Sequence, residues 1–205
     1  MISYAITVCN EARELDRLLG LLKTHLHEGD EVVVQADATN VTEEVKLVLM
    51  LYEGIVTRYV EYPLNFDFAR FKNHLNEQCK GEYIFQLDAD ELPSAWLLNH
   101  LRDIVRKYWW VGLFKLPRIN LFDESNERVA WPDYQGRIFK NRPGRIRWHR
   151  PLHERIRGHW FYWHLPKEDR YALLHHKQKN ADAAKWKEWR RQKEERTQPS
   201  GQSAE

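Results

Sequence analysis

Two hydrophobic patterns alternate along the first half of the chain. Short continuous apolar runs are typical of strands buried on both faces of a parallel sheet, whereas apolar residues spaced three and four apart are typical of amphipathic helices. The runs that predict strands are 2–9, 31–36, 55–62 and 83–88. The segments that predict helices are 11–26, 42–52 and 67–79. Strands that alternate with helices in this order predict an α/β fold, with a mostly parallel central sheet flanked by helices on both faces.

After a further predicted helix at 95–107, the pattern becomes irregular. The segments 109–122 and 135–148 predict long strands that are interrupted by proline and glycine. A charged helix is expected at 182–195, and the polar residues 197–205 are expected to be disordered. We therefore predict a single domain over 1–196, followed by a tail at 197–205. The domain would consist of a regular half at about 1–108, an irregular half at 109–180 and a C-terminal helix at 181–196.

The composition is that of an ordinary globular protein of 205 residues, with 42% hydrophobic and 30% charged residues. The net charge of +2 gives no direction about partners, but basic residues gather at 137–157 and again after residue 177, which suits a polyanionic substrate. The chain has nine tryptophans, most of them after residue 130. Aromatic rings can line a sugar or base site, but we expect most of these to be core residues or anchors.

The cysteines and the N-terminal residues indicate in which cellular compartment the protein is expected. Cys9 and Cys79 are the only cysteines, and each lies in an apolar pattern, so neither a disulfide framework nor a zinc site is expected. No basic segment followed by a long apolar run begins the sequence, and no stretch approaches the ~20 apolar residues that span a membrane. The sequence therefore predicts a cytoplasmic protein without a transmembrane segment.

The segment 83–91 combines a predicted strand with three closely spaced acids. A buried strand cannot carry unpaired carboxylates, so the chain must leave the sheet at Asp88 and present its acids at the carboxyl edge, where ligands bind in open α/β sheets. If the segment is extended, Asp88 and Asp90 share a face. Two such oxygen ligands suit Mg²⁺ or Mn²⁺, which can bridge to a diphosphate. A solvated acidic turn that caps the next helix remains the alternative.

Several motifs, taken in order, resemble the family-two glycosyltransferases of the GT-A fold, particularly their small bacterial and phage members. The motifs are TVCNE at 7–11, the stretch 32–42, FDFARFKN at 66–73 and LDADE at 87–91, with PLHE at 151–154 and HHK at 175–177 extending the match. The resemblance implies a GT-A-like fold whose first half binds a nucleotide-sugar and whose irregular C-terminal region binds an acceptor. It also implies an inverting transferase reaction that depends on Mn²⁺ or Mg²⁺.

The resemblance also implies roles for individual residues. Asn10 and Glu11 would contact the nucleotide, although they could instead cap the first helix. Asp88 would lie near the ribose and the metal, and Asp90 would ligate the metal. A late histidine would complete that site, and the His-x-Lys pattern at 175–177 points to His175 over His176. Adjacent strand positions point opposite ways, so at most one of the two histidines should face the metal. The general base that faces the acceptor would be one of two acids, Glu154 or Glu91.

One stretch departs from the family pattern. The second strand of the family usually ends in aspartate, but Gln35 stands at that position, and Asp37 lies two residues later. An amide can still hydrogen-bond a base or a ribose, although with a different set of donors and acceptors. We therefore keep both Gln35 and Asp37 as candidate nucleotide contacts, and the departure leaves open a catalytically silent domain of the same fold.

For three further candidate site residues, a purely structural role is an alternative to ligand contact. Asn73 is a candidate donor contact but also a natural hydrogen-bonder on its helix. Arg137 is a candidate contact for a phosphate or an acidic acceptor, with a solvated charged face as the alternative. His153 is a candidate acceptor contact or a packed polar residue.

Two other functions compete with the transferase reading. A metal-dependent phosphohydrolase or nucleotidyltransferase could use the same acids. A nucleic-acid-binding protein could use the basic, tryptophan-rich second half for backbone contacts and base stacking. The second is disfavoured, because acids at a strand edge repel phosphate unless a metal lies between them. The expected partners are a nucleotide-sugar donor and an acceptor that the sequence does not identify, whether a saccharide, a lipid-linked sugar or a protein.

Overall fold

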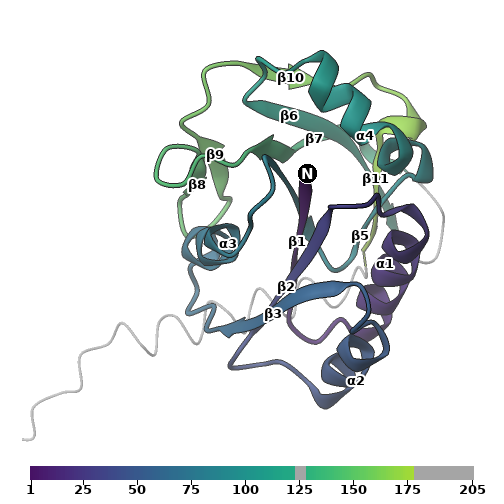
Figure 1. Cartoon of the computed structure of the whole chain (residues 1–205), viewed down its shortest axis with the longest axis vertical. Helices are drawn as coiled ribbons and strands as arrows, with labels where there is room; N and C mark the ends of the chain where they lie inside the picture. Colours follow the sequence, from purple (N-terminus) through teal and green to yellow (C-terminus); the bar gives the residue numbers. More distant parts are fainter. Residues whose placement is uncertain (123–127, 178–205) are drawn as a thin grey trace, which may run out of the picture.

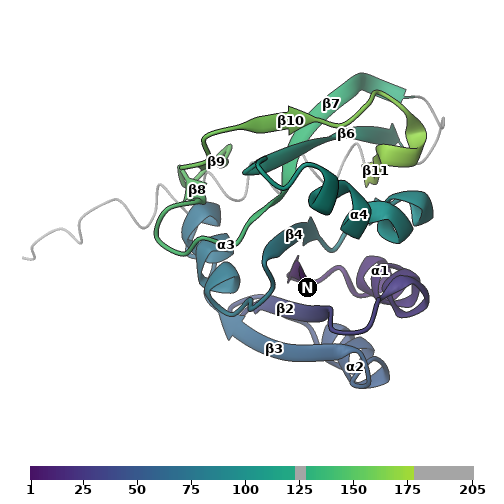
Figure 2. The same cartoon turned by 45° about the horizontal axis from the view of Figure 1, so that its top comes forward.

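The computed structural model describes residues 1–122 and 128–177. Its first half is a parallel sheet with the strand order β3-β2-β1-β4 (Figure 1, with β4 labelled in Figure 2). These strands are β1 (Ile2–Val8), β2 (Glu31–Asp37), β3 (Val56–Tyr62) and β4 (Tyr83–Asp88). β1 lies in the middle and pairs in parallel with β2 on one side and with β4 on the other. The carboxyl ends of these strands therefore meet at one edge of the sheet.

Helices cover both faces of this sheet (Figure 2). They are α1 (Ala12–His25), α2 (Glu43–Leu51), α3 (Phe68–Glu77) and α4 (Ala95–Lys107). Successive residues of a strand point to opposite faces, so Ile6 packs in the core under α1, α2 and α4, whereas Ala5 packs in the core under α3. The apolar stripe of α1, at spacings of three and four, is fully buried.

The second half adds antiparallel and mixed strands beside β4. These are β5 (Glu91–Pro93), β6 (Leu113–Phe122), β7 (Arg128–Lys140), β10 (Tyr162–His164) and β11 (Leu173–Lys177), with a short 3-10 helix, η1 (Asp169–Tyr171). β7 pairs antiparallel with both β4 and β6, so β6 runs parallel to β4. β11 and β10 also run parallel to β6. A separate two-stranded sheet joins β8 (Arg147–His149) and β9 (Arg155–Arg157).

The predicted fold class is confirmed, and so are the strands and helices of the first half. The predicted strand at 135–148 is wrong in its bounds, because β7 begins at Arg128 and ends at Lys140. Gly144, at φ +79°, lies in the turn before β8. The three-residue strand β5 is too short to leave a pattern in the sequence. The helix expected at 182–195 and the tail at 197–205 lie outside the described residues, and the division into one domain over 1–196 stays a prediction.

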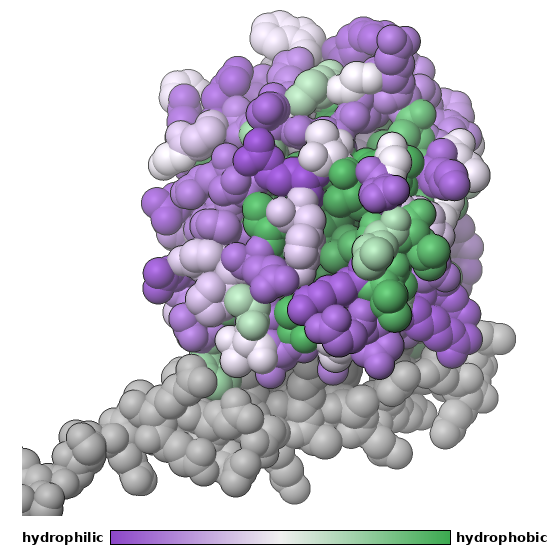
Figure 3. Space-filling view, turned by 60° about the horizontal axis from the view of Figure 1, so that its bottom comes forward, coloured by the Kyte–Doolittle hydropathy of each residue, from purple (hydrophilic) through white to green (hydrophobic). Residues whose placement is uncertain are grey.

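The outer side of α2 is apolar (Figure 3). Leu47, Met50 and Leu51 are 60%, 68% and 74% exposed, whereas Val45 and Leu49 of the same helix are buried. None of the described helices is both long enough and apolar enough to cross a membrane.

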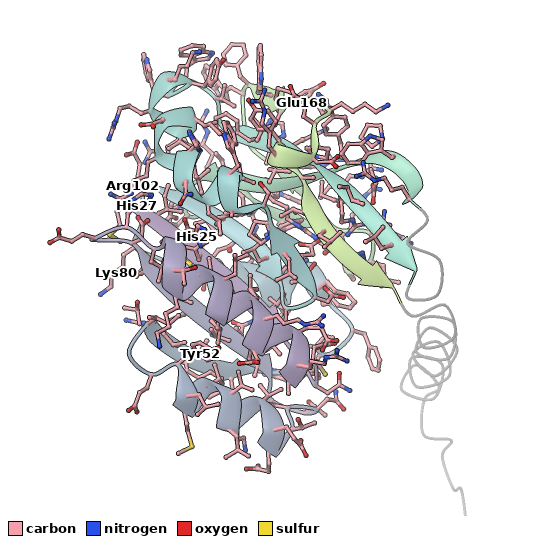
Figure 4. All side chains as sticks on the ribbon, turned by 90° about the vertical axis from the view of Figure 1, so that its right-hand side faces the viewer. His25, His27, Tyr52, Lys80, Arg102 and Glu168 are labelled. Atoms are coloured by element: carbon pink, nitrogen blue, oxygen red, sulfur yellow. The ribbon has the colours of Figure 1, made fainter. Side chains whose placement is uncertain are left out.

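The amino ends of the strands are tied together by buried polar groups. Arg102 reaches from α4 to the turn after α1, near His27 (Figure 4), where its guanidinium donates to Glu28 O and to Asp30 Oδ1 at 2.7 and 2.8 Å. Asp30 Oδ1 also accepts from the backbone N–H of Ile2 at 2.8 Å. The carboxylate of Asp30, just before β2, thus links the start of β1 to α4. This link holds the amino ends of the strands together, at the end of the sheet opposite the carboxyl edge.

We expect Leu19→Ala to lower the free energy of unfolding by about 2–5 kcal/mol, because Leu19 of α1 is completely buried in the core between the helix and the sheet. Leu47→Ala on α2 is the matched control, since its side chain is 60% exposed, and a change of less than about 0.5 kcal/mol is expected. Urea denaturation of both variants measures the difference, and equal effects would contradict the packing described for α1.

Candidate functional site

The acid-rich segment leaves the sheet where the sequence predicts. Asp88 is the last residue of β4, and residues 89 and 90 form a turn before β5. Because this turn is not extended, the expectation that Asp88 and Asp90 share a face does not apply, and the two acids have different neighbours. Asp88 Oδ1 accepts a hydrogen bond of 2.7 Å from the hydroxyl of Thr7, near the end of the adjacent strand β1.

Lys72 of α3 lies beneath this edge and is 2% exposed. Its ammonium group is 3.0 Å from Asp88 Oδ1 and 2.8 Å from Glu154 Oε1. Burial opposes the charged form, but these carboxylates outweigh it and raise the pKa of Lys72. The ring of Trp148 covers the ammonium at 4.9 Å. Lys72 is therefore a permanent positive charge shared by two acids from distant parts of the chain.

Arg137 of β7 supplies the second buried cation. Its Nε and Nη2 donate to Glu91 Oε2 and Oε1 at 2.8 and 2.6 Å, and Nη2 also donates to Asp88 Oδ2 at 2.8 Å. Burial alone would raise the pKa of Glu91 and of Asp88, but the facing cations hold the pKa of both carboxyls below the usual range. Arg118 adds a third contact to Glu91 at 3.1 Å. Both acids therefore stay ionised, Glu91 in the interior and Asp88 where its side chain is still 31% exposed.

Asp90 pairs with a histidine instead of with these cations. His175 Nε2 lies 3.2 Å from Asp90 Oδ2, and His175 Nδ1 lies 2.9 Å from Asn120 Oδ1. The amide of Asn120 is oriented by Asp133, because its Nδ2 donates to Asp133 Oδ2 at 3.2 Å. Asn120 Oδ1 is then placed to accept the proton of His175 Nδ1, and in this tautomer a neutral ring would present the lone pair of Nε2 to Asp90.

A neutral imidazole lone pair and a carboxylate are both acceptors, so they repel each other unless a proton or a cation lies between them. The pair at Asp90 and His175 therefore fits a divalent ion such as Mn²⁺ or Mg²⁺, for which imidazole and carboxylate are suitable ligands. Within residues 1–122 and 128–177, no group of three or more His, Cys, Asp or Glu residues is placed to hold a metal. An ion at this pair would complete its coordination with water or a bound diphosphate.

The ends of β1 and β2 place the predicted nucleotide contacts. Asn10 is exposed, and Glu11 is half-buried with its Oε2 accepting from the backbone N–H groups of Cys9 and Asn10 at 2.8 and 3.1 Å. Glu11 is the N-cap residue of α1, but its side chain makes no hydrogen bond to the first turn of that helix. The carboxylate thus orders the turn that directly follows β1, the strand that carries Thr7.

Three other predicted contacts are engaged inside the protein. Gln35 is completely buried, with its Nε2 donating to Phe71 O at 2.7 Å and its Oε1 2.7 Å from His74 Nδ1. Asp37 is 2% exposed and accepts from the N–H groups of the loops after β2 and β3. Asn73 exchanges hydrogen bonds with the backbone of Trp148 at 2.9 Å. The structure therefore favours the structural reading of Asn73, and it makes Gln35 an interior hydrogen-bonder instead of an accessible nucleotide contact.

The two candidate bases differ in access. The side chain of Glu91 is 1% exposed and surrounded by arginines, whereas that of Glu154 is 17% exposed. Glu154 follows His153, an exposed residue with φ +52°, in the loop whose Pro151 O accepts from the N–H of Phe68 in α3. Only Glu154 can therefore meet an external hydroxyl without dismantling a buried ion pair. Arg137 is 4% exposed, so its geometry favours holding acids over contacting an acceptor.

Four residues of the site had no assigned role in the sequence analysis: Lys72, Arg118, Asn120 and Asp133. One of them carried a signal. Lys72 lies four residues after Phe68 and three before Leu75, on the apolar face of the predicted helix, where a lysine indicates a buried charge with a partner. The others lie on β6 and β7, where no local pattern shows which residues of the two strands become neighbours. His175 lies 3.2 Å from Asp90, and its role as a metal ligand stays a prediction, while the side chain of His176 lies outside the described residues.

We expect Arg137→Ala to lower the free energy of unfolding by about 3–5 kcal/mol at neutral pH, because it leaves the carboxylate of Glu91 buried without its main partner. The exposed Arg147→Ala is the control, with a change of less than about 0.5 kcal/mol.

The lowered pKa of Asp88 and Glu91 stabilises the fold above the unfolded-state pKa of about 4, and this stabilisation is lost as the pH falls further. In urea titrations at several pH values, the difference between wild type and Arg137→Ala should shrink in acid. A difference that does not depend on pH would contradict this network.

Solved structures resemble this arrangement of strands and helices. TarS 1-349 from S. aureus, crystallised with UDP-GlcNAc, aligns with a TM-score of 0.65 and 13% identity over 87% of this chain and 59% of that one. Glucosyl-3-phosphoglycerate synthase from Mycobacterium tuberculosis, crystallised with Mn²⁺, UDP and phosphoglyceric acid, aligns with a TM-score of 0.51 and 12% identity over 69% and 56%. The chain thus spans less than two thirds of either structure. No protein-family model and no curated protein matches the sequence. At such identities the likeness establishes the fold alone, and on it the chain has the GT-A glycosyltransferase fold.

Proposed function

We propose that this protein is a metal-dependent glycosyltransferase that moves a sugar from a nucleoside diphosphate to an acceptor hydroxyl, with inversion at the anomeric carbon. The observation that carries the proposal is the pair formed by Asp90 and His175 at the carboxyl edge of the sheet. Open α/β sheets bind their ligands at this edge. The two relatives in fold, crystallised with UDP-GlcNAc and with UDP and Mn²⁺, make a nucleoside diphosphate the natural donor to test.

Asp90 and His175 would hold the divalent ion, and Asn120 would keep His175 in the tautomer that ligates through Nε2. A bound Mn²⁺ or Mg²⁺ neutralises the charge that develops on the departing diphosphate. Asp88 lies at the same edge, between Thr7 and the buried cations, and would face the ribose. Asn10 and Glu11 border the edge at the end of β1 and would contact the nucleotide, and Asp37 would shape the loop after β2 beside them.

Glu154 would act as the general base. Its carboxylate is partly accessible, and the ammonium of Lys72 holds one of its oxygens at 2.8 Å, which leaves the other available to accept a proton from an acceptor hydroxyl. Lys72 also contacts Asp88, so the base and the donor side of the site are positioned by the same cation. His153, exposed beside Glu154, would contact the acceptor.

We expect a nucleoside diphosphate to raise the melting temperature only when Mn²⁺ is present. At a ligand concentration of 100 times Kd, the stabilisation is about 2.7 kcal/mol, or about 5–10 °C for a chain of this size. The test is a thermal-shift panel of nucleoside diphosphates with and without Mn²⁺. Asp90→Asn should abolish the response, because it removes the anionic ligand of the pair.

Asp103→Asn is the matched control, since Asp103 is an exposed acid on α4 with a side chain 73% exposed, and it should respond like wild type. A response that survives in Asp90→Asn would place the ion elsewhere. The absence of any response in wild type across the panel would refute the proposed donor class.

We expect Glu154→Gln to lower the turnover of sugar transfer by about 10²–10⁴-fold, the contribution of a general base, while it keeps the Mn²⁺-dependent thermal shift. Glu77→Gln, at an exposed position of α3, is the control and should keep full turnover. Glycan-acceptor mixtures with a labelled donor provide the assay. Hydrolysis of the donor that is insensitive to acceptors and to Glu154→Gln would favour a phosphohydrolase instead.

A further inference from the structure

Large aromatic side chains gather on the surface at the amino edge of the sheet. We call this surface the aromatic edge: its rings belong to residues 108–110 and 160–163. The exposed fractions are 78% for Trp160, 66% for Trp109, 61% for Phe161, 52% for Tyr162, 49% for Trp110 and 47% for Trp163. Of the two roles expected for most tryptophans, core residue or anchor, these positions do not have the first, and among the described tryptophans only Trp148 is buried.

Backbone contacts hold the two segments of the aromatic edge together. The N–H groups of Gly112 and Leu113 both donate to Phe161 O, at 2.9 and 3.2 Å, and β10 continues this pairing beside β6. Gly158 has φ +86°, and a Cβ there would lie 1.7 Å from the carbonyl oxygen of Arg145, so the chain makes a close crossing just before Trp160. The rings are therefore presented outward by a fixed backbone frame.

Cations lie against these rings. Lys107 is 5.2 Å from the centre of the Tyr108 ring, and Lys140 is 5.9 Å from that of Trp109. Across the surface, Lys115 lies 4.5 Å from the Tyr162 ring and Arg145 lies 4.9 Å from the Trp160 ring. The segments 107–110 and 157–164 contain no aspartate or glutamate. The aromatic edge thus combines exposed apolar rings with a positive rim.

We propose that the aromatic edge docks on the surface of a lipid bilayer that contains anionic headgroups. Tryptophan and tyrosine favour the boundary between headgroups and acyl chains, and lysine and arginine beside them attract anionic lipid. Interfaces between proteins are depleted in lysine, whereas three lysines lie against these rings. Stacking of nucleic-acid bases needs open ring faces, and here cations occupy faces of the rings.

The aromatic edge lies at the opposite end of the sheet from Asp90 and His175. β6 begins at Leu113, which is level with the start of β10, and reaches Asn120, which is level with His175. Leu113 and Asn120 are seven positions apart along β6, which corresponds to about 23 Å at ~3.3 Å per residue. A protein docked by its aromatic edge would keep its carboxyl edge open to donor and acceptor, and the inference does not rest on the proposed reaction.

The test is co-sedimentation of the full chain with vesicles of phosphatidylcholine and phosphatidylglycerol, compared with vesicles of phosphatidylcholine alone. We expect binding to the anionic vesicles, weakened by high salt, and little binding to the neutral ones. The double variant Trp160→Ser/Phe161→Ser should bind at least about tenfold more weakly, because each buried aromatic ring contributes about that much. Lys107→Gln/Lys140→Gln should weaken binding by about fivefold for each cation removed.

Two matched controls lie elsewhere on the molecule. Leu47→Ser/Met50→Ser removes exposed apolar side chains from α2, and Arg17→Gln/Lys23→Gln removes exposed cations from α1, so both should bind like wild type. Circular dichroism checks that each variant is folded.

Two outcomes would overturn the proposal. The first is that the folded wild-type chain does not sediment with anionic vesicles, and the second is that the α2 control weakens binding as much as Trp160→Ser/Phe161→Ser. If vesicles are not bound, another association that this aromatic variant abolishes would show what the surface binds instead. Binding to a single-stranded oligonucleotide would then assign the surface to nucleic acid, and a concentration-dependent dimer would assign it to a second copy of the chain.

Discussion

The neutralisation of buried carboxylates by two buried cations is the interaction on which the rest of the site depends. Asp88 ends β4 and Glu91 begins β5 at a point where the chain is still covered by α3 and β7. Carboxylates in such surroundings are tolerated only with charged partners. Lys72 and Arg137 provide these from two different elements, so the carboxyl edge is assembled only when α3 and β7 pack against β4.

This neutralisation separates the acids of the site into two kinds. Glu91 is enclosed by arginines and holds the edge in shape, whereas Asp90, two residues after the end of β4, turns away to meet His175. Glu154 lies between these extremes, bound on one oxygen by Lys72 but accessible to solvent. Carboxylates can therefore take different roles, as a scaffold at Glu91 and, in the proposed function, as a metal ligand at Asp90 and a base at Glu154, because each has a different number of cations around it.

The polarity of the strands also separates two surfaces. Because β6 runs parallel to β4, the acids and His175 gather where these strands end, and the aromatic edge gathers where β6 and β10 begin. Charge follows this division: the carboxyl edge balances acids with bases, whereas the segment 157–164 has no acid at all. The two ends of one sheet can thus meet partners of different chemistry without competing for the same residues.

The sequence by itself determined the order of strands and helices in the first half and the edge at which its acids emerge, because hydrophobic periodicity and the cost of burying charge are local properties. The family resemblance pointed to His175 through its His-x-Lys pattern, and the alternation of side chains along a strand allowed only one of the two adjacent histidines to face the site. Only the tertiary structure decided that Gln35 is an interior hydrogen-bonder and that Glu91 is locked by Arg137. It also decided that the tryptophans near residue 160 lie outside the core. Those outcomes depend on which residues of distant strands become neighbours, and strand pairing between distant segments leaves no periodic trace in either one.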